Sequence, residues 1–399
     1  MSSHQSRPQT RTPNPSWFEL FYDLIVVAIV AQVAKVFLSA PSWAMTGLIL
    51  STVLTLFTVW LLVTLSHSVI PADDPIRRAI LLGQMILLAV AALALGKDGL
   101  PGWIGFAAMS GALLAMTAVF VRNARQSEAL RRLVNTMAIS TSAGAAVFAL
   151  GMFASLALGD AESFPLASML ILLGCLVTAL PVIGPTLREL LDRSALDLAH
   201  LEERCALFVI IVLGESFVGL LLSLGRIGSI PNPGIFVLTF VIAFAIWAVY
   251  FNSVLPSRMP TSVAGLRGWI LGHALLLTST VAFAVQFTDL TMSPDPAQGL
   301  LDNGRWTPLP LLGIAVALAA LALIAQDVAK SLRNVQLAAC LVLGLLFVAD
   351  LIISPSEIGI SGNIFTTMGA FVLIGDSVAC EVIRARMGRG TEVEKVGHG

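Results

Sequence analysis

Long apolar runs alternate with short polar connectors along almost the whole chain. Runs of about 20 residues are long enough to cross ~30 Å of hydrocarbon as a helix. Most of the connectors carry prolines, which break helices. The pattern predicts an all-α polytopic integral membrane protein with about twelve transmembrane helices. The predicted spans are residues 17–38, 43–66, 77–96, 102–121, 132–158, 164–184, 203–224, 233–255, 267–288, 307–327, 334–353 and 361–383.

The composition agrees with a membrane protein and excludes other classes. Hydrophobic residues make up 57% of the 399 residues and charged residues only 12%, which is too apolar for a water-soluble domain of this length. A net charge of −1, with basic residues scattered among the connectors, argues against a nucleic-acid partner. The four cysteines lie in or beside apolar runs without metal-ligand spacing, so we expect neither a metal nor a cofactor.

The distribution of Lys and Arg predicts the topology. If the N-terminus is cytoplasmic, 19 of the 23 Lys and Arg residues fall in inner segments and three in outer segments. Both termini are therefore expected on the cytoplasmic side of the membrane. Residues 1–16 and 385–399 are expected to be cytoplasmic tails, and residues 17–184 and 185–384 to form two six-helix halves.

Two sequence alignments indicate that these halves are pseudo-repeats. Glu19 and Gln32 are 13 residues apart, as are Glu202 and Glu215, so the first and seventh spans can be aligned. An even number of spans in each repeat gives the halves the same orientation, related by an axis along the membrane normal.

The third and ninth spans align more closely. Residues 78–88 match residues 267–277, which places Gln84 opposite His273. A lone His at this depth suits either proton relay or a hydrogen-bonded packing role.

The first span opens on the segment 17–24, which holds Glu19 and Asp23. Residues four apart lie on one face of a helix. A charged side chain near the membrane centre costs roughly 2.5 kcal/mol or more, so this face should look into the protein or into water. The alternative is that both carboxylates lie at the interface and only orient the helix.

A second polar segment, residues 200–216, opens the seventh span. His200, Glu203 and Arg204 gather at its inner end, where they are expected to form a charge cluster with each other or with Glu19 and Asp23.

Glu215 lies much deeper in the same span. It is eleven residues beyond Arg204, roughly 16 Å along a helix, which places it near the bilayer middle. A carboxylate there is expected to meet a cation or a water-filled cavity, or else to be protonated and hydrogen-bonded to neighbouring backbone.

These two segments carry a family resemblance that covers nearly the whole chain. Residues 17–24 resemble the ELFFDL-type start of the bacterial low temperature requirement A (LtrA) proteins, and residues 200–216 resemble their ER-x-x-LF-x-IIVLGES segment. The second span departs from the family, because only Trp60 and His67 stand where Trp, Tyr and Asn are frequent. The family is named for a growth phenotype in the cold, and the resemblance implies no substrate. It implies a bacterial inner-membrane protein whose polar positions are Glu19, Asp23, Glu203, Arg204 and Glu215.

The function predicted from these features is secondary transport of a small solute, with proton or cation coupling at the intramembrane carboxylates. Its partners would be the lipid bilayer and the solute or cation, with an oligomer left open. Gln32, Gln84, His200 and Asp376 are secondary candidates, and Asp376 is expected to join the central cavity. A cation channel is the alternative, since an acidic residue after an aromatic in duplicated six-helix units also resembles the endosomal potassium channels.

An intramembrane enzyme is a third class and is not expected. Neither a phosphate-binding GxxxxGK[ST] loop nor a GxSxG nucleophile elbow occurs in the sequence. Only His200 with Glu203 offers a weak pair of metal ligands.

Overall fold

Helices form nearly all of the described part of the chain, in which no strand occurs. The computed structural model describes residues 17–39, 43–69, 74–95, 100–124, 131–192, 196–255, 259–292, 309–324, 330–353 and 361–396.

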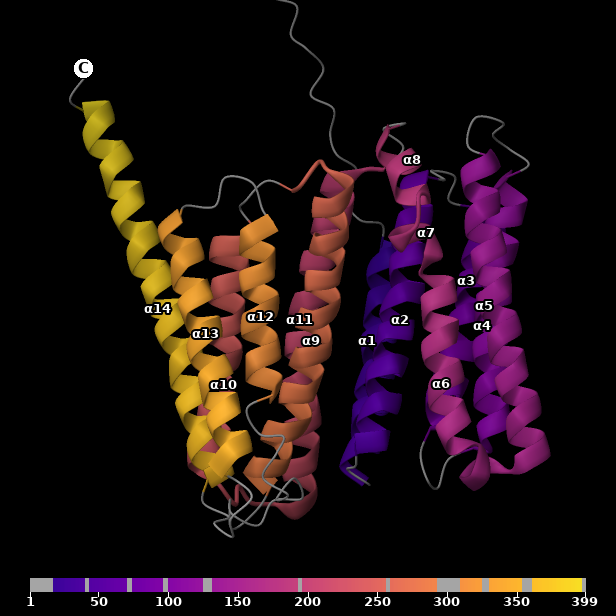
Figure 1. The fold of residues 1–399 in the computed structure, drawn as a ribbon, viewed down its shortest axis with the longest axis horizontal. Coiled ribbons are helices and arrows are strands. Elements are labelled where there is room, and N and C mark those ends of the chain that lie inside the picture. The colour runs from indigo at the N-terminus through magenta and orange to yellow at the C-terminus, as the bar shows by residue number, and fades with distance from the viewer. Residues whose placement is uncertain are drawn as a thin grey trace, which may run out of the picture.

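A helix covers most of every predicted span (Figure 1). The first group comprises α1 (Trp17–Ser39), α2 (Trp43–Val69), α3 (Pro75–Leu93), α4 (Gly102–Ala124), α5 (Arg131–Leu158), α6 (Asp160–Thr178) and the short α7 (Leu180–Ile183) and α8 (Thr186–Asp192). The second comprises α9 (Leu198–Ile227), α10 (Pro233–Val249), the π-helical η1 (Tyr250–Val254), α11 (Val263–Met292), α12 (Leu309–Ile324), α13 (Lys330–Ile353) and α14 (Ser361–Val396).

Eight helical segments of the described residues are long and apolar enough to cross a membrane, which confirms an all-helical, multi-pass architecture. They are Trp17–Ala34, Gly47–His67, Pro75–Leu93, Gly102–Ala124, Arg131–Leu158, Leu198–Ile227, Pro233–Asn252 and Val263–Met292. Among the described residues, the predicted number of twelve is not confirmed. The apolar segments Leu166–Thr178 and Leu311–Leu323 are shorter, and α6 stops at Thr178, just before Pro181 near the start of the next helix.

The last helix continues beyond the predicted span. Helix α14 runs without a break as far as Val396, so the described part of the predicted cytoplasmic tail, residues 385–399, is helical. The other predicted tail, residues 1–16, lies outside the described residues. The start of α1 and the end of α14 lie at the same end of the bundle (Figure 1).

The two groups meet through α1 and α2 on one side and α9 and α11 on the other. Helices α4, α5 and α6 pack against each other away from this junction, and there small residues bring them close. A Cβ added at Gly151 of α5 would collide with the ring of Phe106 on α4, and one added at Gly144 would collide with Thr178. Large apolar side chains such as Ile139, 69% exposed, cover the outer faces, as expected for contact with lipid.

Candidate functional site

The beginnings of α1 and α9 are joined by a buried ion pair. Nη2 of Arg204 donates to Oδ1 of Asp23 at 2.6 Å, and both residues have a relative exposure of 0%. Glu19, one turn earlier on α1, is also buried. This arrangement agrees with the charge cluster expected between the two segments, with both carboxylates turned into the protein.

Helix α2 adds an aromatic partner to the ion pair. Nε1 of Trp60 donates to the same Asp23 oxygen at 2.6 Å, and the Trp60 ring stacks on Phe208 of α9 with centroids 4.4 Å apart. Within the described part of the chain, Oδ2 of Asp23 and both Nε and Nη1 of Arg204 have no hydrogen-bond partner. A buried pair stabilises a fold only when its remaining donors and acceptors are satisfied, so this pair is a weak structural anchor.

Two histidines flank the other carboxylate. Oε1 of Glu19 lies 3.2 Å from Nε2 of His200 on α9 and 3.6 Å from Nδ1 of His67 on α2. Nδ1 of His67 is also 2.9 Å from the carbonyl oxygen of Val63, so this nitrogen carries the hydrogen. We name Glu19, Asp23, Trp60, His67, His200 and Arg204 the inner cluster. A polar site therefore does form between the first two helices, although the second span is poor in the Trp, Tyr and Asn that are frequent there in the family.

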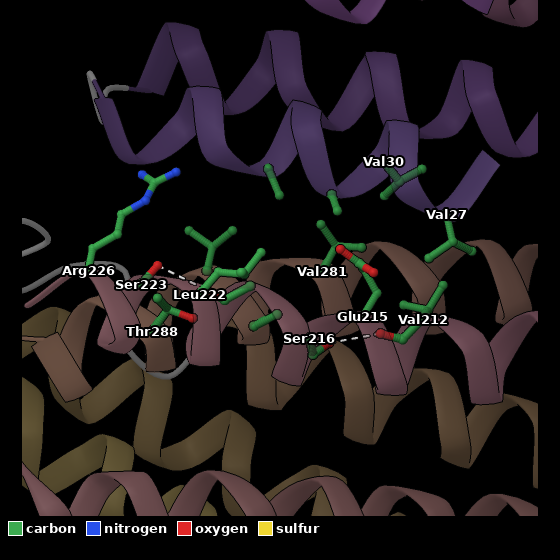
Figure 2. A pocket seen from close by; sticks show the side chains of 15 residues that line it. Val27, Val30, Val212, Glu215, Ser216, Leu222, Ser223, Arg226, Val281 and Thr288 are labelled. Carbon is green, nitrogen blue, oxygen red and sulfur yellow. Dashed lines mark hydrogen bonds between the residues drawn. The ribbon is translucent and has the colours of Figure 1, made fainter. Parts of the chain in front are cut away.

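A cavity of about 290 Å³ lies beyond the inner cluster, between α1, α9 and α11 (Figure 2). Val27, one turn after Asp23 on α1, lines it together with Val212 of α9. Glu215 and Arg226 extend from α9 toward α1, with Arg226 at the end of the cavity opposite Val27. The cavity thus begins about one helical turn past the ion pair.

Three charged residues mark one face of α9. Arg204, Glu215 and Arg226 are separated by eleven residues each, and eleven residues make three turns plus only about 20°. The first belongs to the inner cluster, and the other two line the cavity. The helix reaches Arg226 because it ends only at Gly228, which takes the left-handed conformation (φ 66°) that favours glycine after a helix.

Comparison with known proteins identifies the chain at the level of family. The family model described as bacterial low temperature requirement A protein (LtrA) matches residues 14–373, which is most of the chain. The chain belongs to the LtrA family. No curated protein matched the sequence of this LtrA protein.

The LtrA motif residues do not all meet at one place. Glu19, Asp23 and Arg204 lie in the inner cluster, and Glu215 lines the cavity. Glu203 is exposed, contrary to the expectation of a cluster that includes it. The reason is helical geometry: successive residues are 100° apart, so turning Arg204 toward α1 turns its neighbour away.

The main candidate His273 and the secondary candidate Gln84 hold tyrosines instead of lining the cavity. Gln84 accepts from the Tyr22 hydroxyl at 3.1 Å and donates to the carbonyl oxygen of Ala112 at 3.1 Å. His273 bonds the Tyr250 hydroxyl through Nε2 at 2.8 Å and the carbonyl oxygen of Trp269 through Nδ1 at 2.9 Å. Because the carbonyl needs a donor, the hydrogen is on Nδ1 and Tyr250 donates to Nε2. This geometry agrees with the packing alternative for His273.

Two further candidates also lie apart from the cavity. Gln32 is half-buried on α1 and is not among the lining residues. Asp376 is buried on α14, where Cys380 contacts its Oδ1 at 3.7 Å, and it does not reach the central cavity as expected. Helix α14 packs on α10, α12 and α13, which explains the separation.

Sequence reasoning missed three residues of the site: Trp60, His67 and Arg226. The first two lie on the second span, but their partners lie on other helices, which periodicity within one helix does not reveal. Arg226 is one of the three basic residues that the charge count places in outer segments. Its eleven-residue spacing from Glu215 is the signal that could have placed it on the same helix face.

Proposed function

We propose that this LtrA protein is a secondary transporter of a small solute, coupled to a proton or another cation through Glu215. The observation that carries the proposal is a cavity with a carboxylate halfway along α9, ending one turn from a buried ion pair. While the pair is intact, we expect a solute to reach this cavity only from the end that carries Arg226. Alternating access requires this kind of one-sided closure.

The proposal includes the full topology: twelve spans in the bacterial inner membrane, two pseudo-repeated six-helix halves and both termini in the cytoplasm. The positive charges in the predicted inner segments support it, as does the position of the first and last helices at one end of the bundle (Figure 1). A cysteine introduced at Ser6 should resist a membrane-impermeant reagent applied from the periplasmic side, whereas one at Gln298 should react. The reverse pattern would refute this orientation.

The inner cluster would then act as the inner gate. Asp23 belongs to the first proposed half and Arg204 to the second, so a shift of one half against the other would separate them. Their unsatisfied polar atoms make that separation less costly than breaking a fully hydrogen-bonded pair. Water entering the open gate would solvate both charges.

Reconstitution into proteoliposomes tests the proposal. A pH-sensitive dye inside the vesicles should report proton movement that is driven by added solute and saturates with its concentration. Glu215→Gln keeps the side-chain shape but cannot titrate, so coupled proton movement should fall to the level of empty vesicles. Glu203→Gln, the same change at an exposed position on the same helix, should retain wild-type behaviour.

Two results would count against secondary transport. Unsaturated currents through single molecules would indicate a cation channel. Wild-type gradient dependence in Glu215→Gln would remove this residue from the coupling mechanism.

A further inference from the structure

Apart from Arg226 and Thr288, the polar groups that line the cavity are hydrogen-bond acceptors. The hydroxyl of Ser216, next along α9, donates to the carbonyl oxygen of Val212 at 2.9 Å, and the hydroxyl of Ser223 donates to that of Gly219 at 2.9 Å. Each hydroxyl has one hydrogen, so both present only oxygen lone pairs to the cavity. Together with the carboxylate, these oxygens suit a ligand that carries N–H donors and a positive charge.

The remaining walls are hydrocarbon. Helix α1 contributes Val27, Val30, Ala31 and Ala34, and the α11 contribution is also apolar apart from Thr288. At ~30 Å³ for each water molecule, a cavity of about 290 Å³ holds roughly ten waters or an organic molecule of similar size. A bare metal ion would fill a small part of this space and leave water against valine and alanine. An ammonium group joined to a short hydrocarbon chain matches both the walls and the volume.

The position of Arg226 argues against α-amino acids as ligands. Its backbone is eleven residues, or roughly 16 Å along the axis, from that of Glu215. In an α-amino acid the nitrogen and the carboxyl carbon are separated by only two bonds of about 1.5 Å each. An α-amino acid with its ammonium on Glu215 would reach Arg226 only if the arginine side chain folded back along the helix.

We infer that the cavity binds a small alkylammonium ion at Glu215, and that a proton and this cation occupy the carboxylate in turn. Binding of the cation to the protonated site releases one proton, so atoms and charge balance. This inference rests on the proposed transport function and specifies it as exchange of an organic cation for a proton.

The charges near Glu215 make it the group that controls such an exchange. On its own helix, Arg204 is paired with Asp23 and Arg226 lies three turns away. The residues that α1 and α11 contribute to the cavity include none that titrates. Lys35 of α1 has a side chain outside the described set. Lower pH should therefore weaken cation binding through Glu215.

Calorimetry on the purified full chain in lipid nanodiscs tests the site with three probes of equal carbon number: n-pentylammonium, pentanoate and norvaline. Pentylammonium should bind at least tenfold more tightly than the other two. Titrations in buffers with different ionisation enthalpies should show proton release on binding, with weaker affinity and more release as pH falls.

Variants test whether cation binding and proton release both depend on Glu215. Glu215→Gln should weaken pentylammonium binding at least tenfold and abolish proton release, whereas the exposed control Glu203→Gln should change neither by more than twofold. Glu215→Asp retains a carboxylate and should still release a proton. If Glu215→Gln does not fold, the wild-type titrations and Glu215→Asp still decide the question.

The results separate this inference from the proposed function. Preference for pentanoate, equal binding of all three probes, or binding without proton release would overturn the cation site. Pentylammonium binding without any flux in proteoliposomes would refute transport and leave the site intact. Proton-coupled flux of some other solute, with no pentylammonium binding, would keep transport and reject this substrate class.

Discussion

Helices α4, α5 and α6 pack together in a different way from helices α1, α9 and α11, which form the junction between the two groups. The described residues of α4, α5 and α6 bury no charged side chain, and their buried hydroxyls are hydrogen-bonded, as Ser140 is to the carbonyl oxygen of Val177 at 2.6 Å. The junction buries Asp23 and Arg204 with atoms left unsatisfied, and beside them it encloses a cavity. We call the first region the scaffold; under the proposed transport function, the second is the region that rearranges.

The positions of carboxylates also differ between the scaffold and the junction. Asp160 at the start of α6 accepts from the Ser155 hydroxyl at 2.5 Å and from the backbone N–H of Gly102 at 3.0 Å, which ties α4, α5 and α6 together. Asp74 links α3 to α4 through Arg122. Carboxylates in the scaffold therefore stay at the helix ends, whereas those of the junction are buried between helices.

The largest expected effect comes from breaking the buried pair. Arg204→Gln leaves the Asp23 carboxylate buried without a counter-charge, which should lower the free energy of unfolding by roughly 3–5 kcal/mol. Thermal unfolding followed by tryptophan fluorescence would measure it. The double variant Asp23→Asn/Arg204→Gln has no unpaired charge and should recover part of the loss. A single variant as stable as wild type would show that the pair bears no energetic role.

Alanine substitution of one glycine in each region should show how differently the two regions are packed. A Cβ at Gly151 meets the Phe106 ring, whereas a Cβ at Gly214 of α9 meets nothing within 4 Å. Gly151→Ala should therefore destabilise the protein by about 1–3 kcal/mol through overpacking. Gly214→Ala should stabilise it by up to ~1 kcal/mol, because alanine favours helix. Equal effects of the two changes in the same unfolding assay would contradict the contrast.

The smallest effect is expected at Asp74, outside the membrane segments. The hydrogen bond from Arg122, followed by that from the backbone N–H of Arg77, holds the pKa of this carboxyl below its usual range. A lowered pKa in the folded state stabilises the fold above the unfolded value of about 3.9, and this contribution disappears as pH falls through the folded pKa.

Asp74→Asn tests the sign of this effect, because asparagine still caps α3 but carries no charge. Near neutral pH, wild type should unfold at a slightly higher temperature than Asp74→Asn. This difference in unfolding temperature should disappear as the pH is lowered through the folded pKa of Asp74. A difference that grew at acidic pH would contradict a lowered pKa of Asp74 in the folded state.

Helical periodicity predicted much of the site because its charged residues lie on single faces of two helices. Glu19 and Asp23 are one turn apart, and Arg204 is the residue of its segment that turns toward them. Periodicity does not predict which face of a helix turns toward the protein interior, because this depends on the rotation of the whole helix about its axis. From the sequence, Glu203 was as good a candidate for the charge cluster as Arg204. Only the packed structure shows that Glu203 is exposed.

Other features depend on contacts between helices that no single segment encodes. The π-helical turn Tyr250–Val254 follows a continuous apolar run, and its Tyr250 meets His273 across the interface. Gln84 and His273, aligned as equivalent in sequence, both hold tyrosines, yet Tyr22 comes from α1 and Tyr250 from η1, which follows α10. Similar residues in aligned segments can thus have partners from helices that do not correspond.

The regular spacing along α9 has an electrical consequence. Arg204 and Arg226 are 22 residues apart, roughly 33 Å along the helix and close to the ~30 Å thickness of the hydrocarbon layer, with Glu215 midway. A unit charge there senses about half of the transmembrane voltage, or about 1.2 kcal/mol at 100 mV. That is roughly a sevenfold change in occupancy. Exchange of one proton for one monovalent cation moves no net charge over a full cycle, so voltage would set how often the site is filled without setting the direction of exchange.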